Sequence, residues 1–160
     1  MHQKFEFEYQ QFQDSTSLAM ADQELLEAAR KATQNAYAPY SNFWVGAAAR
    51  LSNHQIVIGA NQESASFPVG VCAERALLNS VGSQFPNLII HSMAISYQPV
   101  GKASNEPISP CGMCRQSLLD FETRYGAPIK IILAGMQGQV MIISSASNLL
   151  PFGFDGKILK

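Results

Sequence analysis

Three cysteines and one glutamate are the residues of this chain whose types and spacing best support chemistry. The 160 residues include only three cysteines: Cys72 lies in VCAERALL, and Cys111 and Cys114 lie in SPCGMCRQ. Thiolates are soft ligands that suit zinc, and an i, i+3 pair near a helix start brings two sulfurs to one side of a turn. We therefore predict one Zn²⁺ per chain, bound by Cys72, Cys111 and Cys114, rather than a redox pair or two core cysteines.

The number of thiols indicates a catalytic metal site. A closed structural zinc site uses four protein ligands, whereas a catalytic site uses three and leaves a position for water. A histidine could close the site, and the chain has His2, His54 and His91. We interpret all three as ordinary histidines: His2 in a terminal extension, His54 in a surface turn, and His91 in a strand on the face of Met93 and Ile95.

Glu74 and two arginines are placed to support such a metal. Glu74 follows Cys72 by two residues, in the first turn of an expected helix. A carboxylate there can take a proton from water and return it to a substrate, although a first-turn acid can also merely offset the helix dipole. Because three thiolates leave the zinc complex negatively charged, we expect Arg75, more than Arg115, to donate hydrogen bonds to them.

The hydrophobic periodicity predicts the element order α-β-β-α-β-α-β-β. We expect a helix from Asp22, its cap, that ends before Pro39, and a third helix capped by Ser109. The ranges are helices from residue 22 to about 36, 72–83 and 111–125, with strands at 44–51, 55–60, 88–97, 129–134 and 140–144. Strand-helix-strand crossovers imply a partly parallel sheet with helices on both faces. The predicted fold class is therefore α/β, a three-layer α-β-α arrangement with a five-stranded mixed sheet.

The length and composition favour a single domain. We assign residues 21–160 to one zinc-binding domain and residues 1–20 to an N-terminal extension of uncertain order, in which FEFEY could form a strand before QDSTS ends it. Apolar residues make up 47% of the chain and charged residues 14%, as expected for a globular protein.

The charge and cysteine content narrow the partners. A net charge of −1 gives no attraction to nucleic acid or to an anionic membrane, so we expect neither as a partner. No run of 18 apolar residues and no signal-peptide pattern are present. Three is an odd number of cysteines, so we predict reduced thiols and a cytoplasmic protein.

Several motifs in sequence order resemble the cytidine deaminase family, in its short-chain homotetrameric branch. The resemblance runs from about residue 28 to 154. It rests on YSNFWVGAA (40–48), GANQESASF (59–67), CAER, PCGMCRQ and LLPFGF (149–154). Zinc deaminases activate water for attack on the base, with a glutamate as general acid and base. The resemblance implies hydrolysis of cytidine and 2′-deoxycytidine to uridine and 2′-deoxyuridine with release of ammonia, in pyrimidine salvage.

The resemblance also implies roles for individual residues. The proton shuttle falls on Glu74 and the metal ligands on the three cysteines. Ribose hydroxyls would be bound by Asn61 and Glu63. Phe43 would pack near the base and sugar, and backbone groups of Ala73 would meet the pyrimidine edge. In the implied homotetramer, Phe154 would reach the site of a neighbouring subunit.

Three residues depart from the usual family pattern and concern the substrate more than the reaction. They are Trp44, Ser64 in place of an asparagine, and Phe67 in place of a tyrosine. A related branch deaminates blasticidin S and shares the CAE and PCGxCRQ motifs, but it does not usually carry the N-x-E motif that Asn61 and Glu63 form. A modified nucleoside or other aminated heterocycle is the alternative substrate, and a non-catalytic zinc module closed by His91 is a remote alternative.

Overall fold

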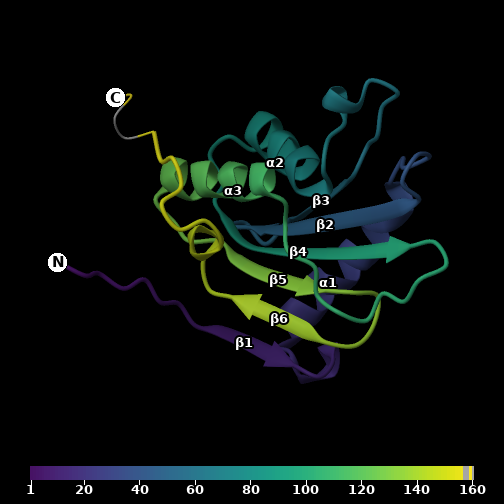
Figure 1. The fold of residues 1–160 in the computed structure, drawn as a ribbon, viewed down its shortest axis with the longest axis horizontal. Coiled ribbons are helices and arrows are strands. Elements are labelled where there is room, and N and C mark those ends of the chain that lie inside the picture. Colours follow the sequence, from purple (N-terminus) through teal and green to yellow (C-terminus); the bar gives the residue numbers. More distant parts are fainter. Residues whose placement is uncertain (157–158, 160) are drawn as a thin grey trace.

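A six-stranded mixed sheet forms the middle layer of the protein in the computed structural model, which describes residues 1–156 and 159 (Figure 1). The strands lie in the order β1-β6-β5-β4-β2-β3, and the β4–β5 pair is parallel while the other pairs are antiparallel. Their bounds are β1 Tyr9–Phe12, β2 Phe43–Leu51, β3 Ile56–Ala60, β4 Ile90–Pro99, β5 Lys130–Ala134 and β6 Val140–Ile143.

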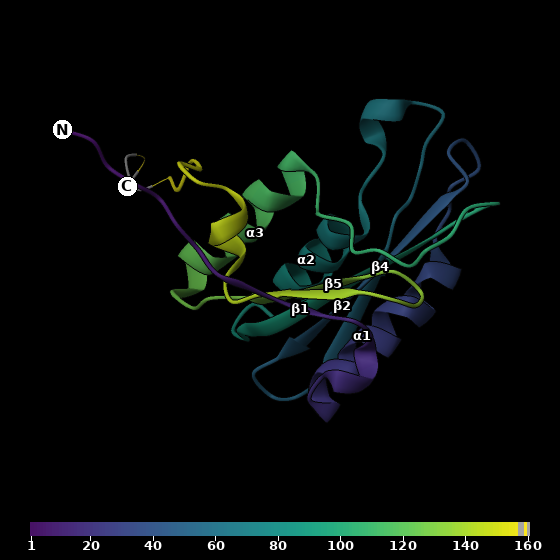
Figure 2. The same ribbon diagram turned by 60° about the horizontal axis from the view of Figure 1, so that its bottom comes forward.

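Helices cover both faces of the sheet, so the predicted three-layer arrangement is confirmed. Helix α1 (Met20–Ala32) lies on one face, and α2 (Ala73–Gln84) and α3 (Gly112–Tyr125) lie on the other (Figure 2). Alternation along the strands divides the core between the faces, so that Leu133 packs with α2 and α3 whereas Ile132 packs with α1. Short 3₁₀ turns complete the chain: η1 Ser15–Ser17, η2 Thr33–Asn35, η3 Phe67–Val69 and η4 Ala146–Leu149. None of the helices in the described part of the chain is long and apolar enough to cross a membrane.

The predicted number of five strands was one too low. The sixth strand, β1, pairs Tyr9 with Ile143 and Phe12 with Val140 of β6. It therefore lies within residues 1–20, next to the FEFEY alternation, and its partner lies more than a hundred residues away. The helix caps also differ from prediction. Ala19 precedes α1, while the carboxylate of Asp22 accepts a hydrogen bond from Lys130, and Cys111 instead of Ser109 is the N-cap of α3.

His91 does not share the core face of Met93 and Ile95. The β2–β4 ladder pairs Arg50 with Ser92 and then Leu51 with Ile90, so His91 is an extra residue in a β-bulge. The bulge turns Ile90 into the core and leaves His91 exposed. His91 lines a cleft on the α1 side of the sheet, together with Arg50 and Lys130. His54 lies in a turn as predicted, with a positive φ of 68°.

Candidate metal centre

The N-termini of α2 and α3 form the candidate site. Strand β2 is antiparallel to both β3 and β4, so these two strands run in the same direction, and the helix that follows each starts at the same edge of the sheet. Cys72 and Cys111 are the N-cap residues of α2 and α3, and Cys114 lies in the first turn of α3. Neither N-cap side chain accepts a capping hydrogen bond from a backbone N–H of its own helix, which leaves both sulfurs available as ligands.

Close packing of α2 on β3 fixes the position of this helix start. Gly59 of β3 faces the first turns of α2. A Cβ atom at Gly59 would lie 2.6 Å from the carbonyl oxygen of Ala73 and 2.8 Å from the Cβ of Leu77. Only glycine allows two backbones to approach so closely. Gly59 thereby determines how closely the start of α2, with Cys72 and Glu74, packs against β3.

The three sulfurs are spaced as a metal ion requires. The Sγ of Cys111 lies 3.8 Å from that of Cys72 and 3.3 Å from that of Cys114, and all three sulfurs lie within 4.8 Å of one another. Tetrahedral zinc with Zn–S bonds of about 2.3 Å needs sulfurs roughly 3.8 Å apart. The thiols therefore fit a soft, tetrahedral dication. Among the described residues, this is the single group of three or more candidate ligands.

The thiols cannot all ionise by themselves. Hydrogen bonding from Cys114, assisted by Cys111 and by the positive charge of Arg75, lowers the pKa of Cys72 to about 6. The same contact with Cys72, together with burial, raises the pKa of Cys114. One thiolate is thus stabilised at neutral pH, and further ionisation is opposed by like charge. A cation between the sulfurs removes that opposition.

Glu74 lies beside the sulfurs in a buried position. Its side chain comes from the first turn of α2 and the residue is 4% exposed. Burial raises the pKa of its carboxyl group, and the negative charge of Cys72 raises it further. The Cys114 thiol is a hydrogen-bond partner of this carboxyl group, which opposes the shift. A raised pKa makes a carboxyl group a stronger base than a free carboxylate, which favours a role in proton transfer.

The two arginines have different surroundings. Arg75 is close enough to Cys72 for its charge to lower the pKa of that thiol. Arg115 donates from Nε to the carbonyl oxygen of Pro110 at 2.9 Å and from Nη1 to that of Leu149 at 3.0 Å. Arg115 was the weaker of the two candidates, and its Nε and Nη1 bind backbone carbonyl oxygens and not the sulfurs. It ties the residue before Cys111 to η4 instead.

Backbone pairing brings the predicted sugar-binding residues next to Cys72. Gln62 exchanges two hydrogen bonds of 2.9 Å with Val71, and a parallel bridge joins Tyr37 to Gln62. Residues 61–63 are thereby fixed between residues 37–41 and the start of α2. The loop that these pairings close bears a cleft of about 360 Å³ lined by Tyr40, Ser41, Glu63, Ser64, Phe67 and Gly70.

Asn61 and Glu63 are held by main-chain groups of the adjacent segment. The Asn61 amide accepts from Val45 N at 2.8 Å and donates to the carbonyl oxygen of Phe43 at 3.0 Å. The Glu63 carboxylate accepts from the backbone N–H groups of Tyr40 and Ser41 at 2.9 and 3.2 Å. The Ser41 hydroxyl and these N–H groups lower the pKa of Glu63, so it is ionised at neutral pH. Both side chains are half-buried and preorganised.

The remaining predicted substrate residues lie in three different surroundings. Phe43, at the start of β2, stacks on Tyr97 with ring centroids 5.2 Å apart. Ala73 is fully buried at the start of α2. Phe154 has an exposed ring, and its carbonyl oxygen accepts a hydrogen bond from Gln116 of α3.

Sequence reasoning missed the residues that orient these side chains. Tyr97 supports Phe43, and the Tyr40–Ser41 backbone holds Glu63. An aromatic residue near the end of an apolar strand, and a turn after Pro39, were the available signals. Neither signal indicates which residue would be contacted, because the contacted residues lie on other elements.

The chain was compared with known proteins. A family model described as "Cytidine and deoxycytidylate deaminase zinc-binding region" matches residues 19–125, which include the three cysteines and Glu74. A cytidine deaminase from Halalkalibacterium halodurans is 33% identical over 135 residues, which cover 84% of this chain and 95% of that protein.

Solved structures agree with this match. The structure of a cytidine deaminase from Burkholderia pseudomallei gives a TM-score of 0.70 at 36% identity and covers 82% of this chain and 97% of that one. A cytidine deaminase from Mycobacterium tuberculosis gives a TM-score of 0.62 at 29% identity, with coverage of 82% and 94%.

Replacing any one of the three cysteines by alanine is expected to abolish stoichiometric zinc binding, because only two protein ligands would remain. Glu74→Gln and His91→Ala should each retain one zinc per chain. Metal content after dialysis against a weak chelator, measured by plasma mass spectrometry, provides the test. Loss of zinc in His91→Ala would show instead that a histidine closes the site.

Proposed function

Since the chain belongs to the cytidine and deoxycytidylate deaminase family, we propose that it is a zinc-dependent deaminase of cytidine and 2′-deoxycytidine that works in pyrimidine salvage. The single observation that carries this proposal is the meeting of three thiols and a buried glutamate at two helix N-termini. A site with three protein ligands leaves a coordination position for water. The three soft thiol ligands and the zinc-binding family together support zinc as the metal.

The proposed chemistry divides between the metal and Glu74. Cys72, Cys111 and Cys114 would hold the zinc, which would supply a water of lowered pKa as the nucleophile. Glu74 accepts one proton from that water and delivers it to N3 of the cytosine ring as the oxygen adds to C4. It then passes the second proton, from the hydroxyl group on C4, to the amino group, which leaves as ammonia while C4 becomes a carbonyl. Burial raises the pKa of the Glu74 carboxyl group, which favours its acting as an acid as well as a base. Arg75 offsets the negative charge of the thiolates, which otherwise weakens the metal as a Lewis acid.

The proposed substrate is a free nucleoside and not a nucleotide or a nucleic acid. Glu63 is the one charged side chain that lines the cleft, and the Ser41 hydroxyl and backbone N–H groups keep its pKa low. An ionised carboxylate accepts hydrogen bonds from sugar hydroxyls and repels a phosphate. Phe43 begins β2 and Asn61 follows the end of β3, and the Asn61 amide donates to the carbonyl oxygen of Phe43. Ala73 would meet the base through its backbone. Ligation by thiolates suits a reducing compartment, so we place this activity in the cytoplasm.

We further propose that the active species is a homotetramer. Exposed apolar side chains gather on the segments near the site, which are the 62–71 loop, the first turn of α3 and the C-terminal segment. They are Phe67, Val69, Met113, Phe152 and Phe154. Apolar surface of this kind is typical of subunit interfaces. Burial against other copies would carry Phe154 to the site of a neighbour.

Glu74→Gln is expected to lower the rate of ammonia release from cytidine by about 10³-fold or more, because the amide cannot shuttle a proton. Zinc content should stay at one per chain, since Glu74 is not a ligand. Ser83→Ala, an exposed position on the same helix, serves as the control and should keep wild-type activity. Full activity of Glu74→Gln would contradict the proposed mechanism.

Cytidine and 2′-deoxycytidine should be deaminated, whereas free cytosine, dCMP and blasticidin S should not be comparable substrates. Glu63→Gln should raise KM for cytidine by about 10-fold, because it loses a charged hydrogen-bond acceptor. Initial rates of ammonia release across the five compounds decide the substrate class. Faster turnover of blasticidin S or dCMP than of both nucleosides would overturn the proposed substrate.

The purified protein should have four times its chain mass of 17.4 kDa in solution. Light scattering coupled to size exclusion gives this mass directly. Phe154→Ala should reduce activity more than zinc content, because its ring is proposed to complete a neighbouring site. A monomer that deaminates cytidine at the full rate would exclude the tetramer.

A further inference from the structure

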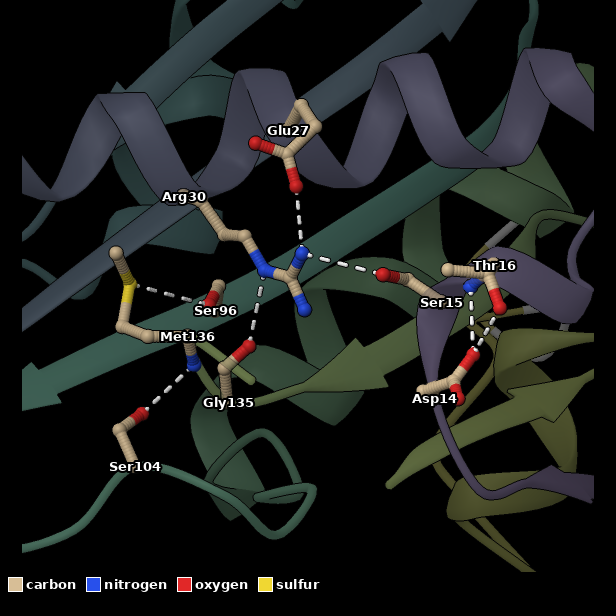
Figure 3. Close-up of polar contacts among 9 residues, drawn as sticks. All are labelled: Asp14, Ser15, Thr16, Glu27, Arg30, Ser96, Ser104, Gly135 and Met136. Carbon is tan, nitrogen blue, oxygen red and sulfur yellow. Dashed lines mark hydrogen bonds and ion pairs between the residues drawn. The ribbon is translucent and has the colours of Figure 1, made fainter. Parts of the chain in front are cut away.

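One peptide unit between β5 and β6 is held from both sides. The carbonyl oxygen of Gly135 accepts a hydrogen bond from Arg30 Nε at 3.1 Å, and the N–H of Met136 donates to the hydroxyl of Ser104 at 2.9 Å (Figure 3). These two groups belong to the same peptide plane. Hydrogen bonds at opposite ends of one peptide strengthen each other, and fixing both ends fixes the plane.

Arg30 anchors one side of this peptide to α1 and to the N-terminal segment. The residue is buried, and its Nη1 donates to Glu27 at 2.5 Å and to the Ser15 hydroxyl at 3.4 Å. Asp14 in turn caps the same η1 turn by accepting from the backbone N–H of Thr16, as Figure 3 shows. This turn precedes residue 19, where the family match begins.

Ser104 anchors the other side to the loop that leads to Cys111. Its hydroxyl accepts from Met136 and donates to the carbonyl oxygen of Tyr97 at 2.5 Å, and its own carbonyl accepts from Gln137. The contact is tight, because a Cβ atom at Gly135 would lie 2.3 Å from the Ser104 carbonyl oxygen. Only glycine fits there. The middle of the loop is thereby fixed to the end of β5.

Tyr97 carries this anchoring to the site. Its backbone carbonyl bonds to Ser104, and its buried ring stacks on Phe43 with an interplanar angle of 18°. Phe43 also receives the Asn61 amide on its carbonyl oxygen. The position of Phe43 therefore depends both on Asn61 and, through Tyr97, on the Ser104 contact.

We propose that Arg30 and Ser104 are positioning residues that act through the Gly135–Met136 peptide to hold Tyr97, and with it Phe43, in the geometry that binds the nucleoside. Neither residue touches substrate or metal. They affect the orientation of the Tyr97 and Phe43 rings. Their loss therefore weakens substrate binding and does not change the proton transfer by Glu74. The proposal rests on the proposed function for its kinetic consequence, but its structural consequence can be measured without turnover.

The chain contains one tryptophan, Trp44, directly after Phe43. Its side chain lies beside Thr33 and Gln98 on the α1 side of the sheet, so its fluorescence reports on the start of β2, which carries Phe43. Arg30→Met and Ser104→Ala should each shift the Trp44 emission and increase its quenching by acrylamide. Both should raise KM for cytidine by about 5- to 10-fold, the size expected for loss of one buried hydrogen bond, and change kcat by less than about 2-fold. The double variant should raise KM little beyond the larger single effect, because both act through one peptide. Zinc should stay at one per chain.

Two matched variants control for general destabilisation. Arg50 is a half-buried arginine that bonds Glu24 and the carbonyl oxygen of Ala21 of α1, and it has no contact with Gly135. Ser92 is a buried serine on β4. Arg50→Met and Ser92→Ala should leave both KM and Trp44 quenching at wild-type values. Arg30→Lys and Ser104→Cys, which keep side-chain size, replace the first pair if either variant fails to fold.

The positioning role of Arg30 and Ser104 and the proposed function can fail separately. Unchanged KM and Trp44 quenching in the Arg30 and Ser104 variants would contradict this positioning role. Equal changes in the control variants would contradict it too. Additive effects in the double variant would also overturn it. A wild-type protein that binds zinc but leaves cytidine intact would refute the proposed function. The Trp44 measurement would still show whether Arg30 and Ser104 fix the start of β2.

Discussion

Three thiols that lie within 4.8 Å of one another cannot all lose their protons unless a cation lies among them. This constraint explains why the site requires a metal ion. Two helix N-termini supply positive dipole ends beside the sulfurs, and Gly59 allows the first of these helices to lie against its strand. The parallel directions of β3 and β4 then bring both helix starts to one sheet edge. A dication among the sulfurs allows all three thiols to ionise, which the fold alone does not allow.

The groups around the thiols depend on the same edge of the sheet. Glu74 follows Cys72 into the buried first turn of α2, where desolvation keeps its pKa high. The Gln62–Val71 pairing brings Asn61 and Glu63 beside that turn, and backbone N–H groups keep the pKa of Glu63 low. The surroundings thus shift the pKa values of the two carboxyl groups in opposite directions. One is suited to moving protons, and the other to binding hydroxyl groups.

The sequence predicted the local features of the fold and site well. Helices α1, α2 and α3 and five strands follow from hydrophobic periodicity, and the cysteine cluster follows from residue type and count. The features that were missed depend on partners distant in sequence. Strand β1 needs β6, the bulge at His91 depends on its register with β2, and Arg115 binds a carbonyl of η4. No pattern within a single segment specifies such pairings.

X-ray absorption at the zinc K edge of the purified, metal-loaded protein tests the central claim most directly, because it counts the ligand atoms without requiring turnover. The account predicts three sulfur scatterers at about 2.3 Å and one oxygen scatterer at about 2.0 to 2.2 Å. Four protein ligands, with the outer-shell signature of an imidazole ring, would contradict an open catalytic position and indicate a closed structural site.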